Sequence, residues 1–360
     1  MRLGFALEYS LGHTTHAQNL KRVLETQPEI APTYVDLPYA GMTGAWTRLP
    51  GVRSNWSLRA SLGAWHGLRR QARHLDGALY HTQVTSLFAA GLMRQVPSVI
   101  SLDATPLQYD ALGAFYGHTP SSNSRLEALK KRLNQRAFGA ARHLVTWSEW
   151  AKNSLVTDYG VSAEKISVIP PGISTALWRR PRTARVPGPV RLLFVGADFA
   201  RKGGDTLLEA FRLLPPDLAH LTVVTKTQDA GNNLPNVTVR HDIAPNSEAL
   251  RTLYADADLF VFPTRGDCLP LAVMEALTSG LPVVTTTVGA LPEAVTHGET
   301  GWIVPPDDAP ALAAALQALA GDAALRERLS VQAALVGSER FDADANYGRL
   351  IRTVQDAKAA

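Results

Sequence analysis

The sequence predicts an α/β protein made of two doubly wound domains. The chain has 360 residues, which at roughly 150 residues per domain corresponds to about two domains. Short apolar segments alternate with amphipathic segments along it, a pattern typical of a parallel sheet with helices on both faces. Its 46% hydrophobic and 19% charged residues are ordinary for a globular protein and give little support to a disordered or fibrous chain.

The second half of the chain shows this alternation most clearly. Runs rich in Val, Leu and Phe predict four strands, at residues 190–197, 220–226, 257–263 and 281–287. The segments between them predict three helices, at residues 203–214, 246–257 and 269–280. An Ala- and Leu-rich stretch from residue 309 predicts further helix, interrupted at Gly321 and Asp322. We therefore expect residues 185–340 to form one doubly wound domain.

The first half repeats the pattern less clearly. It predicts strands at residues 1–8, 77–83, 97–104 and 143–150, and helices at residues 15–25 and 124–141. Residues 178–190 have three prolines and the composition of a linker, which places the domain boundary near residue 185. We expect residues 1–184 to form the N-terminal domain. Residues 341–360 are expected to form a C-terminal helix that could pack back on it.

The two halves differ in charge. Lys and Arg outnumber Asp and Glu by 20 to 11 over residues 1–180, a net +9, whereas residues 181–360 have 16 against 21, a net −5. An asymmetry of this size suggests that the first half meets something anionic, whether a membrane surface, a phosphorylated acceptor or a nucleic acid. Charge does not choose among these three.

The cysteine content and the apolar segments bear on the compartment. Cys268 is the single cysteine, which excludes an internal disulfide and a thiolate-rich metal site. No stretch approaches the roughly 18 apolar residues of a spanning helix, and no export signal is found. These observations predict a cytoplasmic protein. The ten histidines lack the spacing of metal ligands and are expected to be exposed or hydrogen-bonded.

The stretch TRGDCLPLAVMEALTSGLPVV, residues 264–284, has two carboxylates around the start of a predicted helix. With Pro270 in the first turn, Glu275 lies roughly 7.5 Å along the axis and leans back toward the N-terminus, while Asp267 precedes the helix. Free amides at a helix start favour phosphate, and carboxylates accept hydrogen bonds from hydroxyl groups. A nucleotide sugar offers both a diphosphate and hydroxyls, so the stretch predicts a site for one.

This stretch resembles the signature of retaining glycosyltransferase family 4, the glycosyl transferases group 1. The family has a Glu, seven residues and Glu-Ala before a Gly-x-Pro-Val-Val strand; here Asp267 precedes Glu275-Ala276 by the same spacing, and Gly280 to Val284 follow. Blocks at residues 143–173, 194–211 and 289–308 also resemble the family, in the same order. The resemblance spans most of the chain and implies the GT-B fold, with two Rossmann-like domains facing across a cleft.

The resemblance also implies a retaining, metal-independent glycosyltransferase that needs no cofactor. Its second domain would bind a nucleoside-diphosphate sugar, and its first domain would bind a glycan or lipid-linked acceptor. Arg201 and Lys202 would hold the donor diphosphate and offset charge on the leaving nucleotide, as a metal does in other transferases. Glu275 would bind the ribose, and Asp267 would bind hydroxyls of the transferred sugar. The other implied positions are Gly12, Gly196 and the backbone around Cys268, Leu269 and Leu271.

The chain departs from the family pattern at three places. Asp267 stands where members usually have Glu, and Ala197 stands where many have Arg, which leaves Arg201 to supply the second positive charge. Leu102-Asp103 replaces a His-Asp pair, and Asp103 would face the acceptor or the reacting sugar.

Other interpretations stay open at this point. Residues 55–73, with Trp56, Trp65 and several arginines, could lie on an anionic membrane as an amphipathic helix or form a helix with its apolar face in the core. Residues 256–258, Asp-Ala-Asp, match a metal motif of other glycosyltransferases or else link a helix to a strand. The protein could also be an epimerase, a phosphorylase or a nucleotide-sugar-binding protein without transfer activity. No recognised module predicts a nucleic-acid partner.

Overall fold

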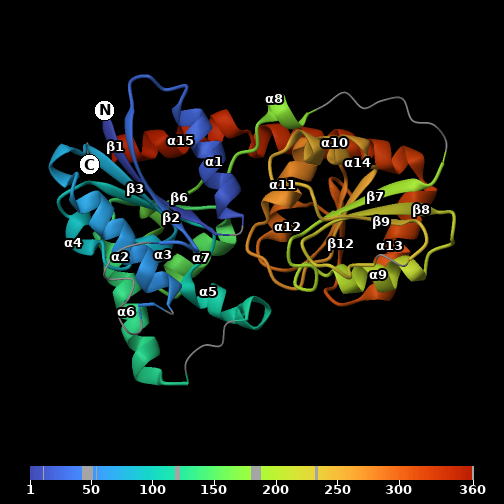
Figure 1. Ribbon diagram of the computed structural model, residues 1–360, viewed down its shortest axis with the longest axis horizontal. Helices are drawn as coiled ribbons and strands as arrows, with labels where there is room; N and C mark the ends of the chain where they lie inside the picture. The colour runs from blue at the N-terminus through green and yellow to red at the C-terminus, as the bar shows by residue number, and fades with distance from the viewer. Residues whose placement is uncertain are drawn as a thin grey trace. The chain divides into compact units, whose positions relative to one another are not determined.

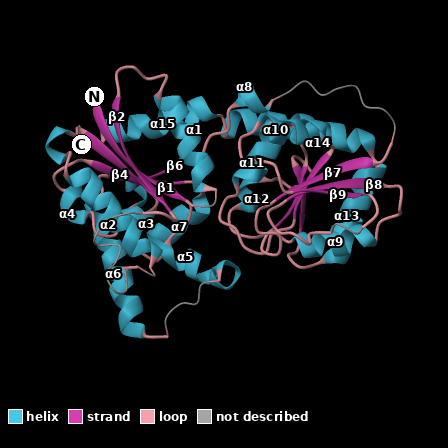
Figure 2. Ribbon diagram, in the orientation of Figure 1, coloured by secondary structure: helices cyan, strands magenta, loops and turns pink. Residues whose placement is uncertain are grey.

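The chain folds into two α/β units. The computed structural model describes residues 1–10, 12–42, 52–53, 55–117, 122–179, 188–231 and 234–358. The boundary expected near residue 185 lies outside the described residues. The first unit comprises Met1–Ala114, His118–Gly172 and Ala343–Ala360, and the second comprises Phe115–Gly117 and Ile173–Asp342. Figures 1 and 2 show the elements of each unit.

None of the helices in the described ranges combines the length and the apolar character needed to cross a bilayer.

The first unit is built on six parallel strands in the order β2-β1-β3-β4-β5-β6. The strands are β1 (Arg2–Tyr9), β2 (Ala31–Pro38), β3 (Gly77–His81), β4 (Ser98–Leu102), β5 (His143–Thr146) and β6 (Ile166–Val168). Successive side chains of a strand point to opposite faces, so Leu3, Phe5 and Leu7 join one core cluster while Ala6 joins another. Both faces of the sheet are therefore buried.

Helices cover both faces of this first sheet. The helices of this unit are α1 (His13–Leu24), α2 (Trp56–Arg69), α3 (Gln83–Ser86), α4 (Ala90–Met93), α5 (Pro106–Ala111), α6 (Ser124–Ala140), α7 (Glu149–Thr157) and α15 (Ala343–Asp356), with 3-10 turns η2 (Ala72–His74) and η4 (Ala163–Lys165). A further 3-10 turn, η3 (Gly113–Tyr116), begins in the first unit and ends in the second. The terminal helix α15 packs against α1 and contributes Tyr347, Leu350 and Val354 to the core on that face.

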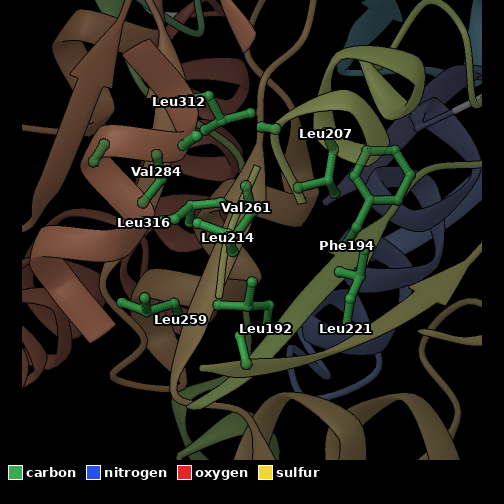
Figure 3. Packing of buried hydrophobic residues seen from close by; sticks show 14 of the residues in the cluster. Leu192, Phe194, Leu207, Leu214, Leu221, Leu259, Val261, Val284, Leu312 and Leu316 are labelled. Atoms are coloured by element: carbon green, nitrogen blue, oxygen red, sulfur yellow. The ribbon is translucent and has the colours of Figure 1, made fainter. Parts of the chain in front are cut away.

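The second unit has the same design. Its parallel strands, in the order β12-β11-β10-β7-β8-β9, are β7 (Val190–Val195), β8 (Ala219–Val224), β9 (Val237–Arg240), β10 (Leu259–Phe262), β11 (Val283–Thr286) and β12 (Gly301–Val304). Its helices are α8 (Thr175–Trp178), α9 (Gly204–Arg212), α10 (Glu248–Asp256), α11 (Leu271–Thr278), α12 (Leu291–Ala294), α13 (Ala309–Gly321) and α14 (Ala323–Arg340). Phe194, Leu221 and Val261 from the strands meet Leu207 from α9 and Leu312 from α13 in one buried cluster (Figure 3).

These elements confirm the α/β prediction, with local differences at element ends. All eight predicted strands are present, but the strand expected at residues 143–150 ends at Thr146. It ends there because the Ser148 hydroxyl accepts a hydrogen bond from the Ala151 amide at 3.2 Å and thereby caps α7. The expected interruption at Gly321 and Asp322 is also present, since the Asp322 carboxylate caps α14 by accepting from the Leu325 amide at 2.8 Å.

One glycine fixes how closely two loops of the second unit approach. Gly203, the N-cap of α9, has φ +76°, a conformation that strains any residue with a side chain. A Cβ atom at Gly203 would lie 1.9 Å from the carbonyl oxygen of Pro263, in the loop after β10. The loops that follow β7 and β10 therefore touch through a position that only glycine can occupy.

We expect Gly203→Ala to lower the unfolding free energy of the second unit by about 3 kcal/mol, because it combines backbone strain with a clash against a fixed carbonyl group. Gly139→Ala is the matched control: Gly139 lies in α6, and a Cβ there meets nothing within 4 Å. That control should be neutral or stabilise by up to ~1 kcal/mol. Thermal and urea denaturation measure both, and equal effects of the two substitutions would contradict the assignment.

Candidate functional site

The site lies where the strand order of the second sheet reverses. The chain runs outward from β7 through β8 to β9 on one side, and from β10 through β11 to β12 on the other. Ligands of open α/β sheets bind outside the carboxyl ends of the strands at such a switch point. There the loop 196–203 follows β7 and the loop 263–270 follows β10. The loops enter α9 and α11, whose N-cap residues, Gly203 and Pro270, make no side-chain cap hydrogen bond.

Lys202 and Asp267 form an ion pair across these two loops. The Lys202 Nζ donates to Asp267 Oδ2, and the two side chains are 14% and 10% exposed. Burial lowers the pKa of the Lys202 ammonium, and the Asp267 carboxylate opposes that shift. Gly196 lies directly against this lysine, because a Cβ atom there would be 2.9 Å from Lys202 Cγ. The pairing unites three of the predicted site residues.

Arg201 is held by the protein itself. Its Nη1 donates to the carbonyl oxygen of Gly266 at 2.9 Å, and its Nε donates to Asp198 Oδ2 at 3.0 Å. The ring of Tyr116, which belongs to the second unit by its contacts, lies 4.3 Å from the guanidinium carbon. Arg201 therefore fixes the loop immediately before Asp267 and keeps its positive charge next to the ion pair.

Arg265 is a residue of this site that the sequence analysis missed. Its amide donates to the Arg201 carbonyl oxygen at 3.0 Å, and its guanidinium donates to the Ala200 carbonyl oxygen at 3.1 Å and to Thr206 Oγ1 at 3.2 Å. It also forms an ion pair with Asp307, in the loop after β12. Arg265 thus ties the loop after β10 to the start of α9 and to a third loop.

The start of α11 differs slightly from the expectation. Pro270 is the N-cap residue and not part of the first turn, with φ −73° and ψ 129°. Cys268, Leu269 and Leu271 have buried side chains, so only their backbones are available to a ligand. The Cys268 amide donates to Asp267 Oδ1 at 3.2 Å, and the Cys268 carbonyl oxygen accepts from the Ala290 amide at 2.9 Å. The predicted backbone segment is therefore held rigidly beside Asp267.

Glu275 lies inside α11, buried, with a different partner. The Tyr254 hydroxyl donates to Glu275 Oε2 at 3.2 Å and also lies 3.2 Å from the Ala272 carbonyl oxygen. Burial raises the pKa of Glu275 to about 7, and the hydrogen bond from Tyr254 opposes that rise. Tyr254 itself stacks on Phe260 and meets Trp178 edge-on. Among the described residues, Lys202 and Asp267 pair with each other, and the hydrogen-bond partner of the Glu275 carboxylate is Tyr254.

The remaining predicted residues, Gly12 and Asp103, lie in the first unit. The strand order there reverses between β1 and β3, and Gly12 is the N-cap of α1 in the loop after β1. Asp103 follows β4, and its Oδ2 lies 3.7 Å from Nε2 of His13. The two positions taken from the sequence therefore meet through His13, at the carboxyl edge of the first sheet.

A cluster of aromatic rings lies behind His13. His16 stacks on His81 with a centroid distance of 4.2 Å, and both rings contact Trp147. Burial lowers the pKa of His16 to about 3 and places that of His81 well below its usual value, and the neighbouring histidines add to both shifts. Both rings are thus neutral at pH 7. Within the described part of the chain, neither ring nitrogen of His81 has a hydrogen-bond partner, so the expectation of exposed or hydrogen-bonded histidines is wrong there.

The open interpretations of two other segments can also be compared with the structure. In α2, Trp56 and Trp65 pack against the core of the first unit, and Arg59 and Arg69 lie over these rings. This supports a helix with its apolar face in the core. Asp258 lies between α10 and β10 and accepts hydrogen bonds from the Arg191 amide and side chain, as expected for a link between a helix and a strand.

Both halves of the chain match family models. Residues 189–322 match the model described as glycosyl transferases group 1, and residues 12–177 match the model of glycosyltransferase family 4. The amylovoran biosynthesis glycosyltransferase AmsK of Erwinia amylovora is 31% identical over 58% of this chain and 55% of its own length. The D-inositol 3-phosphate glycosyltransferase of Streptomyces bingchenggensis is 27% identical over 90% of this chain and 75% of its own. The chain spans about half the length of the first curated relatives it matches.

Solved structures share the whole fold. The sucrose-phosphate synthase of Thermosynechococcus elongatus superposes with a TM-score of 0.76 at 18% identity, covering 99% of this chain and 100% of that one. The Anabaena protein HepE, in complex with UDP and glucose, gives 0.71 at 16% identity, with 99% and 100% covered. These likenesses confirm the predicted two-domain, Rossmann-like GT-B fold.

We expect Lys202→Met to lower the unfolding free energy of the second unit by ~2 kcal/mol, because it leaves the Asp267 carboxylate buried without its cation. Asp267→Asn should cost a similar amount, and the double variant should recover most of the loss. Arg240→Met, which breaks an exposed pair with Asp242, is the control and should barely move the melting temperature. A double variant as unstable as the sum of the singles would refute the coupling.

Proposed function

Because both halves of the chain match glycosyltransferase models, we propose that this protein transfers a sugar from a nucleoside-diphosphate sugar to a hydroxyl group of a glycan or lipid-linked acceptor. The observation that carries the proposal is the Lys202–Asp267 ion pair, beside two helix starts without side-chain caps at the switch point of the second sheet. We propose a transfer that retains the anomeric configuration and needs no metal ion.

The donor diphosphate would bind at the ion pair. Its oxygens would accept hydrogen bonds from the Lys202 ammonium and from free amides at the start of α9 or α11. A diphosphate that engages Lys202 competes with Asp267 for the same ammonium group. The released carboxylate would then accept hydrogen bonds from hydroxyls of the transferred sugar. In the absence of donor, Lys202 and Asp267 therefore hold each other in position.

The main requirement of the reaction is to stabilise the negative charge that develops on the leaving nucleotide. Lys202, together with Arg201 beside it, would offset the negative charge that develops on the diphosphate as the glycosidic bond breaks. Both cations are held before the donor arrives, Lys202 by Asp267 and Arg201 by Gly266 and Asp198. Little reorganisation is then needed during the reaction. The leaving phosphate would take the proton of the acceptor hydroxyl on the same face of the sugar.

The ribose and the acceptor would occupy further positions. Glu275, oriented by the Tyr254 hydroxyl, would accept hydrogen bonds from the ribose. The first unit would bind the acceptor near Asp103 and Gly12, at the carboxyl edge of its sheet. UDP in the solved structure of HepE favours a uridine nucleotide as the first donor to test. Names of relatives such as AmsK favour a role in the synthesis of polysaccharides or glycolipids.

We expect one nucleotide sugar among UDP-, GDP- and ADP-linked donors to raise the melting temperature of the wild type and not that of Lys202→Ala. Saturation at a hundred times the dissociation constant stabilises a protein by about 2.7 kcal/mol, which a thermal shift detects readily. Each variant is compared with its own melting temperature without ligand. Removal of Lys202 alone is expected to destabilise the protein. The double variant Lys202→Met/Asp267→Asn, which should recover most of that stability, is therefore tested beside Lys202→Ala and should also show no thermal shift with the donor.

Incubation of the identified donor alone and with acceptors then separates the functional alternatives. A new glycoside supports transfer, and its anomeric configuration tests retention. A changed donor without acceptor indicates an epimerase. Binding without any conversion supports a binding protein, and the absence of a thermal shift with every nucleotide sugar refutes the site itself.

We expect the affinity for the donor to rise about 10-fold between pH 6 and pH 8, because ribose hydroxyls favour the ionised form of Glu275 and its pKa without ligand is about 7. Below pH 7 binding must release the Glu275 proton. Calorimetry in buffers of different ionisation enthalpy measures that release, and a sugar-linked diphosphate does not itself titrate in this range. Glu275→Gln should abolish the pH dependence; an unchanged pH profile in this variant would show that another group titrates.

A further inference from the structure

The side chain of Arg265 connects three loops at the carboxyl edge of the second sheet. Its Nη1 donates to the Ala200 carbonyl oxygen at 3.1 Å, and its Nη2 donates to Thr206 Oγ1 at 3.2 Å. Its Nε donates to the carboxylate of Asp307, in the loop after β12. All three nitrogens of the guanidinium therefore have a protein partner. Such a group acts on a bound molecule through the residues that it holds.

The two groups that Arg265 holds lie on either side of Lys202 in the sequence. Ala200 lies two residues before this lysine, and Thr206 lies four residues after it. Arg265 itself lies two residues before Asp267, the ion-pair partner of the lysine. One side chain therefore contacts both sides of the turn that presents the Lys202 ammonium. A shift of this turn would alter the distance between the ammonium and the carboxylate.

Asp307 holds Arg265 from a backbone conformation that favours glycine. Its φ is +57°, in the left-handed region. Its Oδ1 accepts a hydrogen bond from Thr206 Oγ1 at 3.3 Å as well as from Arg265. The Asp307 side chain is 54% exposed, so its ion pair adds little to the stability of the fold. The carboxylate thus orients the guanidinium without being needed to hold the unit together.

We propose that Arg265 and Asp307 position Lys202 for the diphosphate of the donor without contacting the donor themselves. This rests on the proposed function, in which Lys202 binds that diphosphate. A chain of contacts runs from Asp307 through the guanidinium to the turn that contains Lys202. A cation that is already in place stabilises developing charge with little reorganisation. Arg265 is therefore a positioning residue.

A direct role for Arg265, as a third cation for the diphosphate, is the alternative. The two roles predict opposite effects of removing the Asp307 carboxylate. If Arg265 bound the diphosphate, loss of this partner would free the guanidinium and tighten binding. If Arg265 positions Lys202, the same loss lets the turn move and weakens binding. The sign of the change in the dissociation constant therefore distinguishes the two roles.

Calorimetric titration of the full chain with UDP, GDP and ADP tests the proposal, because these nucleotides carry the diphosphate whichever sugar is transferred. Wild type is expected to bind one of them. Asp307→Gly should raise its dissociation constant roughly 5-fold, and Arg265→Gln roughly 10-fold. Arg265→Lys should weaken binding as Arg265→Gln does, since an ammonium group keeps the charge but lacks the planar fork that holds three partners.

Asp307→Gly separates positioning from stability. Its melting temperature should stay within about 2 °C of the wild type, because an exposed ion pair contributes little and glycine fits the left-handed backbone. A merely structural role would change the melting temperature or the binding stoichiometry and leave the dissociation constant unchanged.

Asn236→Gly is the matched control. Asn236 also has a left-handed backbone, with φ +60°, and its side chain donates an exposed hydrogen bond to the Pro216 carbonyl oxygen at 2.6 Å. It directly precedes β9 and therefore lies at the opposite edge of the sheet. This variant should bind the nucleotide as the wild type does.

Unchanged or tighter binding by Asp307→Gly overturns the proposal, and so does full rescue by Arg265→Lys or weakened binding by Asn236→Gly. If wild type binds none of the three nucleotides, the nucleotide-sugar site fails and the positioning role fails with it. If the variants weaken binding as expected but no sugar is transferred, the positioning role stands and the proposed transfer fails.

Discussion

The candidate site depends on the adjacency of β7 and β10. These strands pair in parallel at the centre of the second sheet, although Lys202 and Asp267, in the loops that follow them, are 65 residues apart in the sequence. Their carboxyl ends face the same edge, so one loop supplies Lys202 and the other supplies Asp267. Gly203 allows the loops to touch, and Arg201 and Arg265 cross-link them through backbone carbonyl groups. A buried cation and its carboxylate are thereby held at one point.

The strands that could be predicted from the sequence are the central ones. Continuous apolar runs mark β1, β3, β4 and β5 in the first sheet and β7, β8, β10 and β11 in the second. The four strands that were not predicted, β2, β6, β9 and β12, are the outermost strands of the two sheets. An edge strand is partly exposed and often short, and β6 has only three residues. A continuous apolar run indicates a strand that is buried on both faces of the sheet. It is therefore a weaker signal for the partly exposed strands at the edges of a sheet.

In the candidate site, residues in short local motifs could be predicted from the sequence, whereas contacts between distant segments could not. Lys202, Asp267 and Gly196 could be predicted because each stands in a short motif next to a strand or a helix start. The role of Arg265 could not, since its partners Ala200, Thr206 and Asp307 lie 65, 59 and 42 residues away. The ring cluster of the first unit likewise draws His16, His81 and Trp147 from three separate elements. Such contacts depend on how the fold brings distant segments together, and no local sequence motif indicates them.

The discontinuity of the first unit has a consequence for synthesis on the ribosome. Its core on one face includes Tyr347, Leu350, Ile351 and Val354 from α15, which are translated after almost the whole second unit. The second unit is nearly contiguous, from Ile173 to Asp342, and can acquire its structure as soon as it emerges. Strands β1 and β3 are translated earlier, and the apolar face that α15 covers stays exposed until α15 has been made. The second unit can thus complete its fold before the first unit, although the first unit is translated first.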